Sequence, residues 1–221
     1  MKSIVLLQRM CGWWSRIGRG MGALLVAGLL GSGVGAQAAT LEWTGSEPGA
    51  VWSVGGDLNW LTGGLPGVFA NGDDVYFGDQ AVSFAPVITG VVQPNSITVG
   101  GTKDYQFSGA GQIDGATGLR KEGPNTLVIA NANSFTGPVV VDTGILKYGA
   151  LGALGTAAGY VYATNQGSVD LNKTDTSLRT NIIAGAGYEG RGAIINTSTD
   201  SGVNNLVNAV VEDDKLMEEA L

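Results

Sequence analysis

Histidine is absent from this chain of 221 residues, and cysteine occurs once, at Cys11. Without histidine, neither a Ser-His-Asp nor a Cys-His nucleophilic site can form, and no His-based metal site can form. A single cysteine also excludes a disulfide framework. Charged residues are scarce, at 14% of the chain. Any catalysis would therefore depend on carboxylates, lysine, tyrosine or arginine.

Glycine is abundant, with 37 residues, and hydrophobic residues make up 44% of the chain. This apolar content is enough to bury a core, so the composition argues against a disordered protein. Alanine, valine, threonine and asparagine are frequent among the remaining residues. That mixture is more typical of short β-strands joined by tight turns than of helices.

Residues 1–38 are typical of a secretory signal peptide. An uncharged apolar stretch runs from Met21 to about Gly35, and Ala36-Gln37-Ala38 is a small-x-small cleavage site. The alternative is an uncleaved membrane anchor, but the apolar stretch is shorter than the roughly 20 residues that span a bilayer. We expect cleavage after Ala38 and a protein that is secreted or lies on the outer cell surface. The basic residues before the apolar stretch are Lys2, Arg9, Arg16 and Arg19.

Removal of this segment would make the protein strongly acidic. The whole chain has 12 basic and 19 acidic residues, a net charge of −7. Four of the basic residues lie in residues 1–38, so cleavage leaves 8 basic and 19 acidic residues, a net charge of −11. Such a surface repels nucleic acid and anionic lipid. We expect no nucleic acid partner, and no membrane contact after cleavage.

Three tryptophans mark residues 39–100, the segment expected to form an N-terminal cap and the first β coils. Trp43, Trp52 and Trp60 have two interpretations. They form a platform that stacks on sugar rings, or they seal the apolar end of a stack of strands. The second interpretation is favoured, because a stack of repeats needs a cap against edge-to-edge association.

Carboxylates gather in Asn71–Asp79 around a short strand expected at Val75–Phe77. Asp73, Asp74 and Asp79 are weak calcium candidates, because they offer oxygen ligands. They lack the alternation of an EF-hand loop, and aspartate also stabilises turns through its own backbone hydrogen bonds. We therefore assign no metal ligand and no cofactor.

Residues 118–146 carry the clearest pattern in the chain, because short apolar runs alternate with turns. Strands are expected at 127–129, 139–141 and 145–148, with a closing turn at Asp142-Thr143-Gly144. In Gly123-Pro124-Asn125-Thr126, proline is at the second turn position, and Asn125 is expected to take the positive φ of a type II turn. Further strands are expected at residues 160–164, 168–171 and 193–197.

This segment resembles the autotransporter-associated β-strand repeat, also called the passenger-associated transport repeat. Asn125 replaces a glycine of the family pattern, and Pro138 and Val139 depart from its usual small residue and threonine. The matching residues are Leu119, Lys121, Gly123, Thr126, Leu127, Ile129, Asn133, Phe135, Gly137, Val141, Gly144 and Leu146.

The resemblance implies a right-handed parallel β-helix on an exported bacterial surface protein, with a structural role and no catalytic residues. We accordingly expect an all-β chain, a parallel β-helix or solenoid, with coils over 101–209 and the repeat at 118–146. A β-sandwich is the alternative, because strands with turns every ~8–12 residues fit it as well. Residues 210–221 are an acidic tail, either a helical cap or a frayed end.

The function expected is a non-catalytic structural or adhesin-like passenger module, whose partners are surface glycans or other passenger modules. One alternative is a carbohydrate-binding module that uses the N-terminal tryptophans. A weaker alternative is a β-helical polysaccharide lyase with Lys121 or Arg191 as base, but no spacing selects either residue. The pattern Gly185-Ala-Gly-Tyr-Glu-Gly190 matches a dinucleotide-binding fingerprint only formally, because a β-type run follows it.

Overall fold

The structure is a computed structural model that describes residues 39–156, 158–174, 179–199 and 209–211. The expected signal segment and residues 212–221 of the expected tail lie outside the described residues. None of the helical structure in the described part is long and apolar enough to span a membrane. Its single helical element is a three-residue 3-10 turn, η1 (Tyr188–Gly190).

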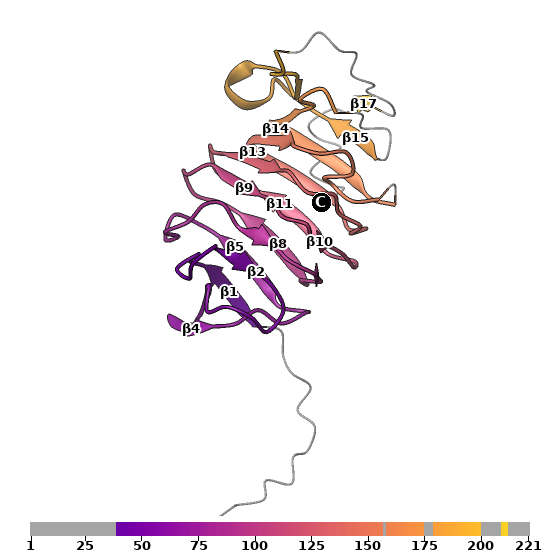
Figure 1. Ribbon diagram of the computed structural model, residues 1–221. Helices are drawn as coiled ribbons and strands as arrows, with labels where there is room; N and C mark the ends of the chain where they lie inside the picture. Colours follow the sequence, from indigo (N-terminus) through magenta and orange to yellow (C-terminus); the bar gives the residue numbers. More distant parts are fainter. Residues whose placement is uncertain (1–38, 157, 175–178, 200–208, 212–221) are drawn as a thin grey trace, which may run out of the picture. The chain divides into compact units, whose positions relative to one another are not determined.

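The main sheet is built from parallel strands that stack as successive rungs (Figure 1). Asp74 pairs with Ser96 and Ser96 pairs with Gly118, so each of these coils takes 22 residues. This periodic parallel pairing defines a β-solenoid. Its rungs are β1 (Thr40–Trp43), β5 (Asp74–Phe77), β8 (Ser96–Val99), β11 (Gly118–Lys121), β13 (Val139–Tyr148), β14 (Tyr160–Asp170), β15 (Thr180–Ile183) and β17 (Ala209–Val211).

The other sides of the coils are formed by shorter parallel strands. β9 (Tyr105–Phe107) pairs with β12 (Thr126–Ile129), which pairs with the second half of β13. The second half of β14 pairs with β16 (Ile194–Ile195). Two small parallel pairs complete the coils: β2 (Val51–Trp52) with β6 (Val87–Ile88), and β7 (Val91–Val92) with β10 (Gln112–Ile113).

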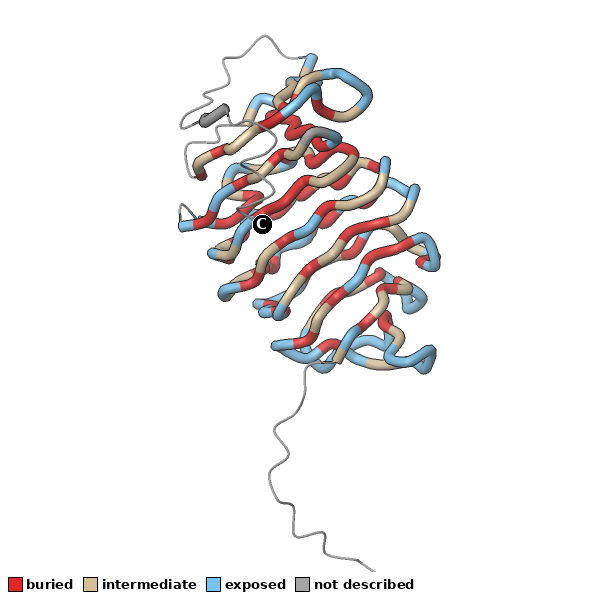
Figure 2. The backbone as a smooth tube through the Cα atoms, turned by 180° about the vertical axis from the view of Figure 1, so that it is seen from behind, coloured by how far each residue is buried: buried red, intermediate tan, exposed pale blue. Residues whose placement is uncertain are grey.

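The core lies inside the coils and is formed by side chains that repeat from rung to rung. Buried and more exposed residues alternate along the strands, because successive side chains of a strand point to opposite faces (Figure 2). Each fully buried aliphatic side chain contributes about 1.5–3 kcal/mol. One inward ladder consists of Leu41, Val75, Ile97, Leu119, Val139 and Val161.

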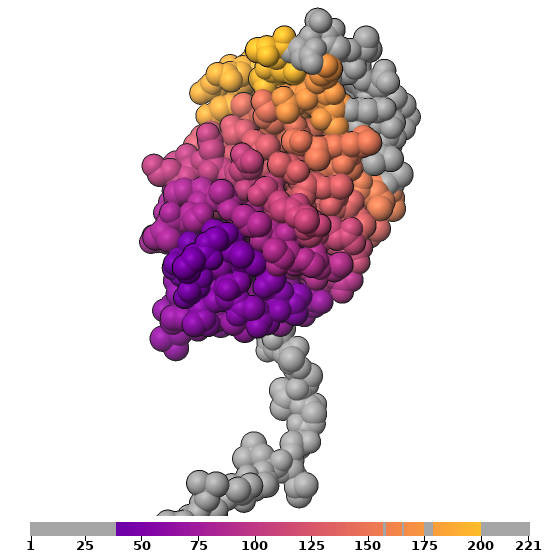
Figure 3. Space-filling view, viewed as in Figure 1, coloured from indigo at the N-terminus to yellow at the C-terminus, as the bar shows by residue number. Residues whose placement is uncertain are grey.

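The N-terminal end of the stack differs from the coils. β3 (Trp60–Thr62) pairs antiparallel with β1, and β4 (Leu65–Gly67) pairs antiparallel with β3. This hairpin is the terminal pair of the main sheet, so it covers the edge of the first rung. In the space-filling view the colours follow one another in bands, so each coil lies beside its neighbours in sequence (Figure 3).

The expected fold class, an all-β parallel β-helix or solenoid, is confirmed, and the β-sandwich is wrong because the coils pair in parallel. Three local predictions are also wrong. Residues 139–148 form one strand with a register shift between Val141 and Thr143, where a turn was expected. Residues 160–170 also form one strand, β14, where two separate strands were expected. The positive φ of the turn at residues 123–126 belongs to Gly123, at 76°, and Asn125 is absent from the residues with positive φ. Gly123 adopts a positive φ without steric cost, because glycine has no Cβ atom. Asn125 is therefore not needed for this conformation, and its side chain makes a different contact.

Candidate functional site

The three tryptophans form the centre of a buried aromatic cluster. Trp60 lies 4.9 Å from Trp43 and 5.5 Å from Trp52, measured between ring centroids. Phe77 packs against all three rings, and Phe69 packs against Trp52 and Trp60. The exposed fractions of the tryptophans are 0% for Trp43 and Trp52 and 1% for Trp60. A platform for sugar rings needs an exposed ring face, and these rings have none in this structure.

The three calcium candidates use their carboxylates to hold the backbone and neighbouring side chains. Asp73 accepts hydrogen bonds from the amides of Ala39 and Ala70, at 3.1 and 2.8 Å. Asp74 Oδ1 accepts from Asn95 Nδ2 at 2.7 Å. Asp79 Oδ1 accepts from the amide of Thr102 at 2.8 Å, in the next coil.

The structure does not bring these carboxylates together as a metal site. No group of three or more His, Cys, Asp or Glu side chains in the described part of the chain is placed to hold a metal ion. Asp73 holds its own turn through the amide of Ala70, as aspartate does in turns, whereas Asp74 and Asp79 bond to residues of the next coil.

Lys121 is a fully buried cation inside the coils. Its Nζ atom donates to the carbonyl oxygens of Glu122, Gly123 and Thr143, at 2.9, 2.8 and 3.0 Å. Burial lowers the pKa of Lys121 to about 8, whereas the nearby Asp104 and Glu122 raise it. An ammonium group has three donors, and three carbonyl acceptors from two successive coils meet them. Lys121 therefore joins the turn of one coil to the strand of the next and is closed to a substrate.

Two asparagines of the repeat segment act in a similar way. Asn133 accepts from the amide of Ile113 at 2.8 Å and donates to the carbonyl of Ala153 at 2.6 Å, so it joins three coils. Asn125 is 2% exposed and donates to the carbonyl of Lys103 at 2.5 Å. Lys121 and Asn133, two of the positions that carry the sequence resemblance, thus make coil-to-coil contacts, and so does Asn125, where the chain departs from the family pattern.

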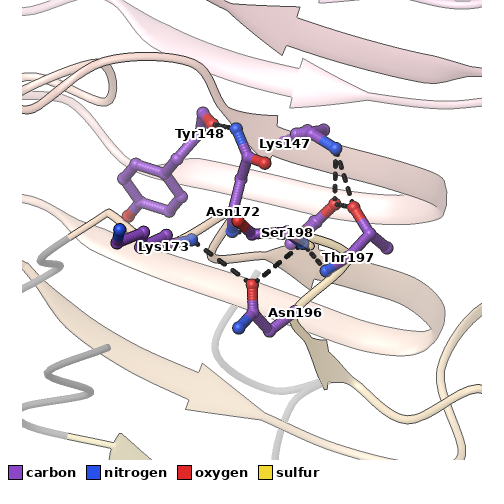
Figure 4. A network of polar contacts seen from close by, with 8 residues as sticks. Lys147, Tyr148, Asn172, Lys173, Asn196, Thr197 and Ser198 are labelled. Atoms are coloured by element: carbon purple, nitrogen blue, oxygen red, sulfur yellow. Dashed lines mark hydrogen bonds and ion pairs between the residues drawn. The ribbon is translucent and has the colours of Figure 1, made fainter. Parts of the chain in front are cut away.

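A polar network near the C-terminal coils joins Lys147, Asp170 and Thr197. Figure 4 labels Lys147 and Thr197 of this network. Lys147 Nζ lies 3.3 Å from Asp170 Oδ2 and donates to Thr197 Oγ1 at 2.7 Å. Thr197 Oγ1 in turn donates to Asp170 Oδ2 at 2.5 Å. Burial alone would raise the pKa of Asp170, but hydrogen bonds from Thr197 and Asn172 and the charge of Lys147 hold it below its usual value.

This network joins successive coils, because Lys147 lies on β13, Asp170 lies on β14 and Thr197 follows β16. Asn172 extends the network by donating to the carbonyl of Tyr148 at 2.8 Å (Figure 4). The sequence analysis did not predict these contacts. The one signal for them was the distance in sequence between Lys147 and Asp170, which is one coil and makes the two residues register partners on adjacent rungs.

The residues considered for a lyase do not form a site. Lys121 is buried between coils, and Arg191 pairs at 3.3 Å with Glu189 on its own loop. The glycine-rich stretch 185–190 follows β15 and ends in η1, and Glu189 has a non-helical φ of 53° within it. A phosphate site of the dinucleotide-binding kind requires a helix that begins at the last glycine, and here there is none.

The fold and its contacts define a class, parallel β-solenoid proteins built from stacked coils. A segment of the chain is similar to the adhesin BmaC autotransporter of Brucella suis biovar 1 (strain 1330), with 35% identity over 85 residues. The match covers 38% of this chain and 2% of the adhesin, so the chain spans a small part of that relative. No protein-family model and no solved structure matches the chain.

Proposed function

We propose that this protein is a non-catalytic, adhesin-like module of the autotransporter passenger type, secreted or held at the outer cell surface. Its segment 118–146 is a copy of the autotransporter-associated β-strand repeat. The observation that carries the proposal is the use of the repeat residues. Lys121, Asn125 and Asn133 all bind the backbone of adjacent coils, so the segment builds a stack and leaves the outer surface for contact. The similarity to an autotransporter adhesin supports this role.

Such a stack supports adhesion by presenting a long surface on a rigid scaffold. Each coil buries its apolar face only against its neighbours, so the scaffold extends by addition of coils. The turns and outer strand faces are the parts that reach another cell or molecule.

The adhesive role is tested with fluorescent beads that carry the purified protein. Several-fold more beads are expected on cultured animal cells, on matrix proteins or on surfaces coated with the same protein than beads that carry albumin. Equal counts on every surface would refute the adhesive role. Export is tested separately, by N-terminal sequencing of protein from the outer surface or medium of expressing bacteria, where Ala39 is the expected first residue.

A further inference from the structure

A groove lies at one corner of the solenoid, and three successive coils form its walls. Its lining consists of Gly72 from one coil, Gln93 to Asn95 from the next and Gly115 to Thr117 from the third. The volume is about 330 Å³, within the range of small-ligand sites. A Cβ atom added at Gly72 would meet nothing within 4 Å, so the space above this residue is open.

Two amide side chains in this groove are held in defined orientations. Gln93 Nε2 donates to Asp114 Oδ2 at 2.8 Å, and Asn95 Nδ2 donates to Asp74 Oδ1 at 2.7 Å. A carboxylate only accepts hydrogen bonds, so the nitrogen end of each amide must face the aspartate. The oxygen ends, Gln93 Oε1 and Asn95 Oδ1, are thereby fixed as acceptors for a ligand that donates hydrogen bonds.

The charges of the groove restrict the ligand further. Asp74 and Asp114 are hydrogen-bonded to the two amides, so their negative charges lie next to the groove and disfavour an anionic ligand. Three of the four carboxylate oxygens of these aspartates already accept hydrogen bonds, which disfavours a cationic ligand. Asp114 accepts from Ser134 Oγ at 2.6 Å and from Gln93, and Asp74 Oδ1 accepts from Asn95 and from Ser96 Oγ. An uncharged ligand with hydroxyl donors fits this arrangement best.

The groove also has apolar lining residues and extends over three coils. Pro94 and Ala116 line it beside the polar atoms, and Ala116 is exposed. Adjacent rungs are about 4.8 Å apart, so three coils span about 10 Å along the axis of the stack. Sugar rings combine hydroxyl groups with apolar C–H faces, and linked rings are elongated. We propose that this groove binds a neutral oligosaccharide, an assignment that rests on the proposed adhesive function and names its ligand class.

The test is binding of the purified full-length protein to an array of neutral, anionic and cationic glycans. Two variants are compared with the wild type: one fills the groove with a large side chain, and one removes a hydrogen-bonding side chain from it. Ala116→Trp should fill the groove and reduce binding to neutral glycans at least 10-fold, and Gln93→Ala should reduce it about fivefold. Matched controls are Ala110→Trp and Gln106→Ala, because both residues are exposed and neither lines the groove. The controls should bind within twofold of the wild type, and equal urea midpoints for all four variants would show that the fold is retained.

The outcomes separate this proposal from the adhesive function. The proposed glycan site is refuted, and the adhesive function stands, if beads adhere to cells but no neutral glycan binds the protein. The same holds if Ala116→Trp binds neutral glycans as tightly as the wild type does. Binding confined to anionic glycans, to amino sugars or to basic peptides also refutes the glycan site. If neutral glycans bind in the groove but beads adhere to no surface, the glycan site is supported and the adhesive function is refuted.

Discussion

Replacement of Gly144 by alanine should separate neighbouring coils at the centre of the repeat. An alanine Cβ there would clash with the carbonyl oxygen of Asn125, and it would lie 2.5 Å from the carbonyl oxygen of Gly123 and 2.8 Å from Lys121 Nζ. Two of these atoms belong to the backbone of the preceding turn, which cannot move without moving its own coil. The φ of +80° adds a second cost, because L-residues avoid this region.

The magnitude follows from these two costs. The left-handed conformation costs alanine roughly 1–2 kcal/mol. Relief of the clash moves β13 away from the turn and weakens two hydrogen bonds, from Ile145 N to the Asn125 carbonyl at 3.1 Å and from Lys121 Nζ to the Thr143 carbonyl at 3.0 Å. Such bonds contribute about 0.5–3 kcal/mol each, the larger values for a charged donor. We expect a total loss of roughly 3–5 kcal/mol, a large part of the usual 5–15 kcal/mol of a folded domain.

Gly90→Ala is the matched control. Gly90 has a similar φ of +68°, but an added Cβ would meet nothing within 4 Å, so only the conformational cost applies. The assay is urea unfolding followed by circular dichroism, with hydrogen exchange at the Ile145 amide as a local measure. Gly144→Ala should be less stable than Gly90→Ala by at least about 2 kcal/mol and should lose protection at Ile145. A difference below about 0.5 kcal/mol would refute the close contact between the coils.

The remaining predictions concern the N-terminal aromatic cluster and the polar network around Asp170. Trp60→Ala should lower the free energy of unfolding, measured in urea, by about 3–5 kcal/mol, because four aromatic neighbours surround this ring. The control Leu65→Ala changes a side chain that is 71% exposed, so it should alter stability little. Similar losses for both variants would argue against the aromatic cap. The contribution of Asp170 to stability should depend on pH. Because the pKa of Asp170 is lowered in the folded state, the folded state binds fewer protons than the unfolded state as the pH falls below about 4. The stabilisation by Asp170 is therefore present at neutral pH and is lost on acidification. Asp170→Asn should therefore be less stable than the wild type at pH 7, and the gap in unfolding free energy should narrow at pH 3; a gap independent of pH would contradict this assignment.

The polar contacts between coils explain how a chain with few charges keeps its register. Apolar ladders alone would tolerate slippage, because neighbouring rungs present similar aliphatic side chains. Lys121 and Asn133 each bind carbonyl oxygens of a different coil, and a shift of one residue would break these bonds. A buried ammonium or amide without partners costs several kcal/mol, so these residues specify one alignment of the coils.

The sequence by itself determined the all-β class and the position of most strands, and its resemblance to a repeat family favoured the solenoid over a β-sandwich. Alternation of apolar residues and the glycine, proline and asparagine of the turns are local properties, so β5 and β12 lie close to where they were expected. The sequence left the tryptophans open as a cap or as a platform, and their burial in the structure favours the cap. The tertiary structure decided the continuous strand β13, the positive φ of Gly123 and the partners of Lys121 and Asp170. It also decided the corner groove, whose walls meet because coils of 20 to 22 residues place distant turns side by side. These features depend on contacts one full coil away, which no local pattern of residues specifies.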